Sequence, residues 1–183
     1  MSGGIRFTQY PDEASPRQSS PADCVERCAW RALDPLPGAA LVEYFAGAAP
    51  APLGAATGAS ASYSCEELSD TGPGARRAPV LMIVAFDVPP ERAAMVERWY
   101  AEEHIELLRR VPGWLRARRY AVREWQGAPR YTSLALHELA DMRVLDARER
   151  AWARSTAWRA VMQDEPWFRA AGRFIYQRLE SNE

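Results

Sequence analysis

Residues 96–113 read VERWYAEEHIELLRRVPG, an amphipathic helical segment that ends in a Pro-Gly turn. On a period of 3.6 residues, Tyr100 and His104 share one face at i, i+4, and apolar residues before and after them extend the same stripe. Pro112-Gly113 does not continue a helix, so the chain is expected to turn there into a strand. The segment predicts a helix that points an imidazole and a phenol toward the layer it covers.

The imidazole of His104 has two interpretations. The ordinary pKa of histidine, about 6.5, lets the ring take up and release a proton near neutral pH. A half-buried ring beside a phenol therefore suits acid–base catalysis. A single histidine on a half-apolar helix is also a common packing residue, and the spacing alone leaves both interpretations open.

The composition is that of an ordinary globular protein. Of 183 residues, 48% are hydrophobic and 26% are charged, and the length suits one domain of moderate size or two small ones. The longest apolar run, residues 80–86, is far shorter than the ~20 residues that a transmembrane helix needs. The N-terminus does not resemble a signal peptide. We therefore expect no membrane partner and a cytoplasmic location.

Charge and cysteine content argue against a nucleic-acid-binding protein and against a zinc protein. All 23 basic residues are arginine, the net charge is −1, and the arginines are interspersed with acids. No basic stripe of the kind that binds nucleic acid results, so no nucleic-acid partner is expected. Cys24, Cys28 and Cys65 lack the spacing and the accompanying histidines of a zinc site. We expect free thiols and no metal.

The second half of the chain has a regular order of elements. Strands are predicted over 80–88, 115–125, 130–139 and 173–179. Helices are predicted over 90–110 and 141–171, the second with a break near Pro166. The order β-α-β-β-α-β predicts an α+β, ferredoxin-like fold, in which a four-stranded antiparallel sheet carries its helices on one face.

Such a sheet leaves its second face uncovered. A broad apolar face is unfavourable in water, so we expect it to pack against a second sheet and form an α/β barrel. The second sheet would come from a homodimer partner, unless the N-terminal half of the same chain completes the barrel.

Residues 1–77 have two interpretations, and we place a domain boundary between residues 77 and 78. Ile5–Gln9 resembles a strand and Cys24–Leu33 a short helix. Two segments repeat, weakly in identity, the order of Val111–Tyr120 and Leu134–Asp141: these are Leu36–Tyr44 and Tyr63–Asp70. The first half would then be a degenerate ferredoxin-like unit without its second helix and closing strand. The alternative is an irregular extension packed on a domain of residues 78–183.

Residues 79–179, a little over half of the chain, resemble the dimeric α/β-barrel superfamily, especially its EthD-like branch. The helix histidine, the Pro-Gly turn and a late tryptophan carry the resemblance. They lie within the segments Val80–Phe86, Arg98–Tyr100, Glu103–Ile105, Val111–Trp114, Arg118–Tyr120, Tyr131–Leu139, Ser155–Trp158, Arg173–Tyr176 and Arg178–Leu179. The resemblance implies two ferredoxin-like units forming a barrel, with a pocket between each sheet and its helices. The superfamily includes cofactor-free monooxygenases, polyketide cyclases, lactone isomerases and haem enzymes, so the fold alone does not give the reaction.

By this resemblance, His104 corresponds to a helix histidine that lines the pocket in several members, with Trp99 and Tyr100 before it. The first half has no corresponding histidine, so one working pocket is expected. Trp158 and Trp167, in the second helical region, could form walls for a flat aromatic ligand together with Trp99. Each tryptophan taken alone is more commonly a core residue.

Three residues of the strands join this candidate site. Tyr120, like Tyr100, could hydrogen-bond a developing oxyanion. Tyr131 and His137 share one face of the strand over 130–139. For His137 a structural role near the strand end is favoured over ligand binding.

Together these features predict an enzyme without a cofactor that transfers protons on an aromatic, polyketide-like or lactone small molecule. His104 would remove the proton, which gives an isomerase or a cyclase/dehydratase. If molecular oxygen reacts with the resulting carbanion, the enzyme is a monooxygenase of phenolic substrates. A non-catalytic small-molecule binding or assembly protein is the alternative from another class. Haem could use one histidine as an axial ligand, but nothing else in the sequence supports it.

Overall fold

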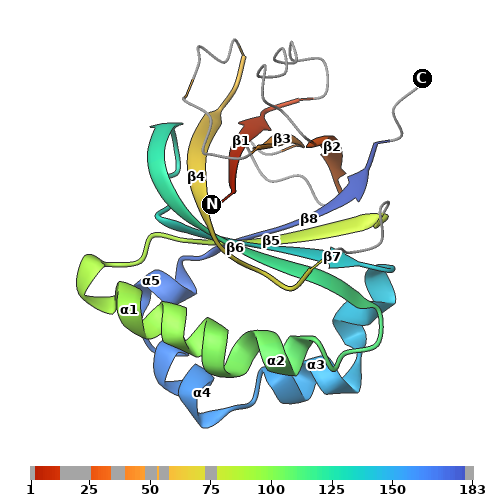
Figure 1. Cartoon of the computed structure of the whole chain (residues 1–183), viewed down its shortest axis with the longest axis vertical. Helices are drawn as coiled ribbons and strands as arrows, with labels where there is room; N and C mark the ends of the chain where they lie inside the picture. Colours follow the sequence, from red (N-terminus) through yellow and green to blue (C-terminus); the bar gives the residue numbers. More distant parts are fainter. Residues whose placement is uncertain are drawn as a thin grey trace.

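Eight antiparallel strands form one closed barrel in the computed structural model, which describes residues 3–12, 26–33, 40–47, 53, 58–72 and 78–179. The strands are β1 (Gly4–Tyr10), β2 (Glu26–Ala32), β3 (Leu41–Gly47), β4 (Ala61–Asp70), β5 (Val80–Phe86), β6 (Trp114–Gly127), β7 (Ser133–Leu139) and β8 (Gly172–Arg178). Around the barrel their order is β1-β3-β2-β8-β5-β7-β6-β4. The described helices all lie on one side of the barrel, against the strands of the second half (Figure 1).

The helix predicted over 90–110 is interrupted in its middle by a π-helical turn. It consists of α1 (Pro90–Trp99), the π-turn η1 (Tyr100–His104) and α2 (Ile105–Leu108). Pro90 occupies the first turn, where the missing N–H has no intrahelical partner to lose. Gly113 then turns the chain into β6 with a φ of 85°, a conformation that favours glycine.

The second helical region is broken into short pieces. These are the 3₁₀ turn η2 (Met142–Asp146), α3 (Arg148–Ala153), α4 (Ala157–Gln163) and α5 (Pro166–Arg169). The side chain of Asp141 caps η2, and that of Thr156 caps α4 by accepting a hydrogen bond from the N–H of Arg159. The break predicted near Pro166 is confirmed, because α5 begins there. The cap at Thr156 adds a second break that the prediction did not include.

The strands of the second half follow the ferredoxin-like order β8-β5-β7-β6. The predicted α+β class and element order are therefore confirmed. The prediction of a separate four-stranded sheet is wrong, because β8 also pairs with β2, and β6 with β4. The backbone N–H and C=O groups at the two edges of a separate sheet would lack hydrogen-bond partners. Closure of the barrel supplies those partners.

The first half contributes four strands in the corresponding order, β4-β1-β3-β2. The short helix predicted over Cys24–Leu33 is wrong, since Glu26–Ala32 form β2, in which Cys28 and Trp30 alternate into the barrel core. The loss of a closing strand is also wrong, because β4 occupies that place. The predicted repeat is therefore shifted by one strand: β4, which contains Tyr63–Asp70, corresponds to β8 and not to β7, and β3 corresponds to β7 and not to β6. Part of the motif repeat, at Leu36–Ala39, and Cys24 itself lie outside the described residues.

Closure within one chain covers the sheet face that led us to expect a homodimer. A second copy of the chain is not needed to complete the barrel. The domain boundary between residues 77 and 78 falls beside residues 73–77, which lie outside the described part of the chain, and it stays a prediction.

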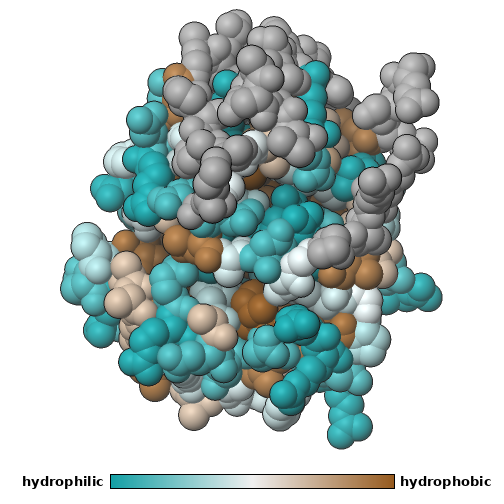
Figure 2. Space-filling view, in the orientation of Figure 1, coloured by the Kyte–Doolittle hydropathy of each residue, from teal (hydrophilic) through white to brown (hydrophobic). Residues whose placement is uncertain are grey.

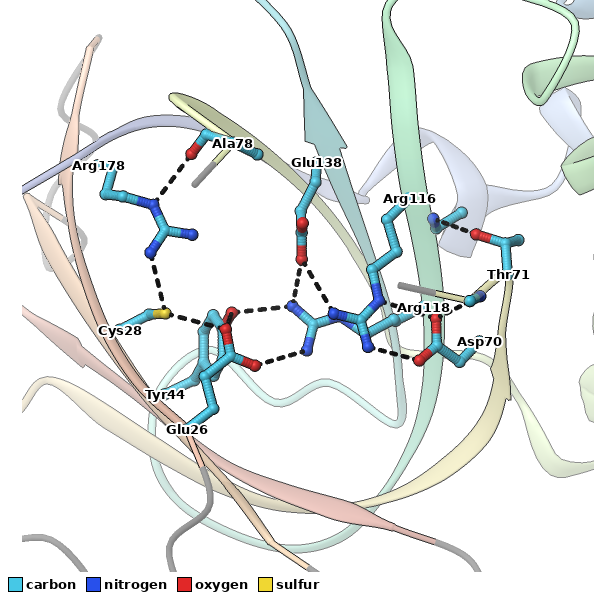
Figure 3. A network of polar contacts seen from close by, with 12 residues as sticks. Glu26, Cys28, Tyr44, Asp70, Thr71, Ala78, Arg116, Arg118, Glu138 and Arg178 are labelled. Carbon is cyan, nitrogen blue, oxygen red and sulfur yellow. Dashed lines mark hydrogen bonds and ion pairs between the residues drawn. The ribbon is translucent and has the colours of Figure 1, made fainter. Parts of the chain in front are cut away.

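The barrel interior is apolar along most of its length, with an ion network at one end (Figure 3). There Arg118, which is 2% exposed, donates to the carboxylate of Glu138 at 2.8 Å and to the hydroxyl of Tyr44 at 2.9 Å. Arg116 forms an ion pair with Asp70. Tyr44 and Asp70 come from the first half and the other three from the second, so this network ties the two halves together.

The outer surface offers no single large apolar face in the view of Figure 2, where hydrophobic residues form small patches among hydrophilic ones. No described helix has the length and apolar character that a bilayer span requires. Cys28 and Cys65 are buried free thiols.

Candidate functional site

A cavity of about 80 Å³ lies between the barrel wall and the helical layer. Its floor is the outer face of β5, β6 and β7, and its cover comes from the helical segments and from the start of β8. Because side chains alternate along a strand, the residues of β5 and β7 that face the barrel interior are different ones. The cavity is therefore separated from the barrel core by the sheet itself.

The π-helical turn brings Trp99, Tyr100 and His104 together at this cavity. In a regular α-helix, residues five apart differ by about 140° in direction and do not face each other. In η1 the N–H of Ile105 bonds to the carbonyl of Tyr100, five residues back, and the imidazole of His104 stacks on the indole of Trp99 at 4.2 Å and 17°. The Tyr100 ring meets the same imidazole edge-on at 5.5 Å. Turns of this kind often occur at functional sites.

The imidazole of His104 is neutral at physiological pH. Burial is the largest cause that lowers its pKa from 6.5 to about 3, followed by repulsion from Arg159, Arg119 and Arg154. A hydrogen bond to the backbone of Ala153 acts in the opposite direction and raises the pKa, because it favours the protonated ring. Nδ1 is buried without a hydrogen-bond partner among the described residues.

Tyr100 lies between this histidine and the buried guanidinium of Arg119. The carbon of that guanidinium lies 3.6 Å from the centre of the Tyr100 ring. Burial raises the pKa of Tyr100, while Arg119 opposes the shift. Arg119 also donates to the carboxylate of Glu97 at 2.5 Å and to the hydroxyl of Ser133 at 3.0 Å. The phenol thus stays protonated beside a fixed positive charge.

His137 faces the same cavity from β7, and its Nδ1 accepts a hydrogen bond of 3.3 Å from the indole of Trp114. Burial is the first cause that lowers its pKa well below 6.5, followed by repulsion from His104 and Arg119. Strand alternation therefore placed this residue on the cavity side of the sheet. Both histidines of the chain line one cavity, and both are neutral.

The sequence analysis did not identify the arginines that line this cavity. Four of them line it, from α3, the turn after α3, α4 and β8: Arg150, Arg154, Arg159 and Arg173. Burial, followed by repulsion from Arg154, lowers the pKa of Arg150, Arg159 and Arg173. In the sequence they lie among other charged residues with no distinguishing spacing. Only the packing of four short segments brings them together.

The remaining candidate residues lie elsewhere. Trp167 packs on Phe86 within the helical layer, and Trp158 is partly buried in the same layer, and neither lines the cavity. Tyr120 and Tyr131 belong to the barrel core on the other face of the sheet. Tyr131 precedes the first residue of β7, so the alternation that we extended back to it does not apply.

No cluster of three or more metal-ligating side chains occurs in the described ranges. Haem, which one histidine could bind as an axial ligand, does not fit the residues present. A porphyrin is far larger than a cavity of about 80 Å³, and the His104 ring is stacked against Trp99.

No family model matches the chain, and no curated protein matches its sequence. Solved structures resemble it over nearly its whole length. An anthrone oxidase-like protein has a TM-score of 0.65 and 9% identity, covering 98% of this chain and 91% of that protein. A ferredoxin-fold protein from Listeria monocytogenes 4b F2365, related to antibiotic biosynthesis monooxygenases, has a TM-score of 0.61 and 9% identity, with coverages of 98% and 95%. A major regulator of staphylococcal pathogenesis has a TM-score of 0.55 and 9% identity, with coverages of 98% and 100%.

At these identities the likeness shows the fold alone. The chain shares the ferredoxin-like α+β fold of proteins related to antibiotic biosynthesis monooxygenases. Nothing in the comparisons is specific to the EthD-like branch, so that finer assignment stays a prediction.

Proposed function

We propose that this protein is a cofactor-independent enzyme that moves a proton on a small aromatic or lactone molecule bound beside His104. One observation carries the proposal: Nδ1 of a neutral imidazole is buried, has no hydrogen-bond partner among the described residues, and belongs to a ring that lines a cavity with aromatic walls. A buried polar atom without a partner is costly, which makes it a candidate for function.

In the proposed reaction the neutral imidazole of His104 accepts a proton from a carbon next to a carbonyl, or from a phenol. Negative charge then develops on the substrate oxygen. The cavity-lining arginines and the protonated phenol of Tyr100 are the groups that would stabilise this charge. Return of the proton to another atom gives an isomerase, and loss of water gives a cyclase or dehydratase.

The arginines have opposite effects on His104 before and during this step. Their repulsion disfavours the imidazolium in the empty cavity. An anion formed next to them offsets that repulsion, so the protonated imidazole is better tolerated when the substrate is deprotonated. The site would thus favour the charge pattern of the intermediate over that of the free enzyme.

Monooxygenation is the second candidate reaction. Two solved structures with this fold are an anthrone oxidase-like protein and a relative of antibiotic biosynthesis monooxygenases. The same carbanion, formed by His104, could transfer electrons to molecular oxygen. The proton-transfer step is common to both reactions, and oxygen dependence separates them.

The test is to incubate the purified chain with hydroxylated aromatic compounds and lactones, with and without oxygen, and to follow products by mass spectrometry. Unchanged mass with a new retention time indicates an isomerase, loss of water a cyclase or dehydratase, and gain of oxygen a monooxygenase. His104→Gln should abolish turnover, while Glu106→Gln, an exposed substitution on the same helix, should not. Binding without turnover would instead favour a non-catalytic binding protein.

A further inference from the structure

We propose that the ligand of this cavity is a small aromatic carboxylate, held by the arginine cluster formed by Arg150, Arg154, Arg159 and Arg173. This inference rests on the proposed function and narrows its substrate class. Three features of the structure carry it: the absence of acidic partners for the cluster, a buried arginine behind the cavity wall, and the size of the cavity.

The arginine cluster is not neutralised by carboxylates. The guanidinium of Arg150 donates to the carbonyl of Leu145, and that of Arg159 to the carbonyl of Arg154 at 3.1 Å. Arg173 donates to the carbonyls of Ala171 and Phe168 at 3.2 and 3.1 Å. No member of the cluster forms an ion pair within the described part of the chain. Several positive charges therefore face one cavity, although the whole chain has a net charge of −1.

Some neighbouring arginines of the same helical layer show the usual pairing. Arg92 pairs with Glu165 at 2.8 Å, and Arg109 pairs with Glu106 at 3.1 Å. Arg110 and Arg148, which are exposed in the same layer, also form no ion pair within the described ranges, so the cavity is distinguished by four arginines without acidic partners that converge on it. An anion inside the cavity would supply the missing charge.

Arg119 is the second, independent observation. It is 1% exposed, and its Nε and Nη1 have no hydrogen-bond partner among the described residues. It lies against Tyr100, which lines the cavity. Its Nη2 pairs with the partly exposed carboxylate of Glu97 at 2.5 Å, but the two buried donors without acceptors remain unfavourable. A bound anion would lower the electrostatic cost of keeping this guanidinium in place.

The size and walls of the cavity limit which ligands can bind. At about 80 Å³, it is smaller than the ~300 to 1,000 Å³ of typical drug-sized sites, which favours one ring over a polycyclic molecule. Trp99 and Phe168 provide flat apolar walls beside the guanidinium groups. The planar fork of arginine matches the two oxygens of a carboxylate. A benzoate-like molecule combines both requirements.

The experiment measures binding of benzoate, of its neutral counterpart benzamide and of inorganic phosphate to the full chain. Two-dimensional NMR of the ¹⁵N-labelled protein follows the indole N–H of Trp99 during each titration. We expect benzoate to bind at least about tenfold more tightly than benzamide, as for hydrogen bonds to a charged group. Its affinity should fall as salt is added, because Arg154 and Arg173 of the cluster are exposed to solvent.

Arg154→Gln is the informative variant, because Arg154 is exposed at the cavity and its side chain makes no hydrogen bond within the described ranges. It should weaken benzoate binding about tenfold and leave benzamide unchanged. Arg109→Gln is the matched control and should change neither. Arg159→Gln provides a second substitution inside the cluster, with the same expected result.

Equal affinity for benzoate and benzamide, or benzoate binding that neither cluster variant changes, would overturn the inference. Phosphate binding as tight as benzoate binding would do so as well, since it would indicate a general anion site. His104→Gln keeps the cluster intact, so benzoate binding should persist in it even where turnover is lost. Failure of the proton-transfer function and failure of carboxylate recognition are thereby distinguished.

Discussion

Acidification from pH 7 to pH 5.5 should destabilise this protein through its two histidines, His104 and His137. Burial is the main cause that lowers the pKa of both rings in the folded state, to about 3 for His104. In the unfolded chain each ring titrates near 6.5. Between the two pKa values the unfolded state binds more protons, so the free energy of unfolding falls as the pH falls below about 6.5.

The size of this effect follows from the unfolded pKa. At pH 5.5 neither folded ring binds an appreciable fraction of a proton, so the exact folded pKa hardly matters. Each histidine then loses roughly 1 kcal/mol of stabilisation between pH 7 and pH 5.5, and the pair about twice as much. Burial raises the pKa of Glu138 above 4.5, which opposes this loss in the wild-type chain. Comparison between variants removes that contribution.

Urea unfolding at pH 7.0, 6.0 and 5.5 tests this reasoning in the wild type, His104→Gln, His137→Gln and the double variant. Glutamine does not take up a proton in this range. The double variant should lose less stability on acidification than the wild type. Each single substitution should account for about half of that difference. An equal pH dependence in all four proteins would show that the rings are not held neutral, and would refute their placement in a buried cationic cavity.

Three further predictions concern single residues. His104→Gln should lower turnover by at least about 10²-fold, as expected for loss of a general base, with little change in the midpoint of thermal unfolding at pH 8; a parallel loss of folding would favour a packing role. Gly113→Ala should destabilise by about 1 to 3 kcal/mol in urea unfolding, because φ is 85° and the new methyl would lie 2.6 Å from a Val144 methyl; an unchanged midpoint would contradict it. Glu138→Leu leaves Arg118 buried without its closest carboxylate and should lower the free energy of unfolding by about 3 kcal/mol. Glu102→Ala, in an exposed ion pair, should lower it by less than about 1 kcal/mol, and equal effects would refute the distinction.

Local pattern was sufficient for the second half of the fold. Apolar runs, proline and glycine positions predicted the elements that became β5, α1, β6, β7 and β8. These signals lie within a few residues of each other in the sequence. In the first half the same reasoning failed at Glu26–Ala32, because the strand is stabilised by pairing with β3 and β8, which are distant in sequence. A seven-residue segment has too few positions for its period to decide between helix and strand.

The candidate site was predictable only in part. The i, i+4 spacing of Tyr100 and His104 predicted that both face the sheet. It did not predict the π-turn, which stacks His104 on Trp99. Tyr120 and Tyr131 lie on the opposite face of the sheet, and their placement depends on strand register. The arginine cluster comes from four separate segments, and no spacing along the chain connects them.

The amino-acid sequence by itself determined the class of fold and the helix that carries the histidine, because both depend on periodicity within short segments. Tertiary structure alone decided that the first half closes the barrel, that both histidines share one cavity, and that arginines without acidic partners surround it. These properties depend on the direction of side chains from distant segments and on the charge that collects where those segments meet. They arise only when the chain is folded, because burial is what makes the charges interact strongly.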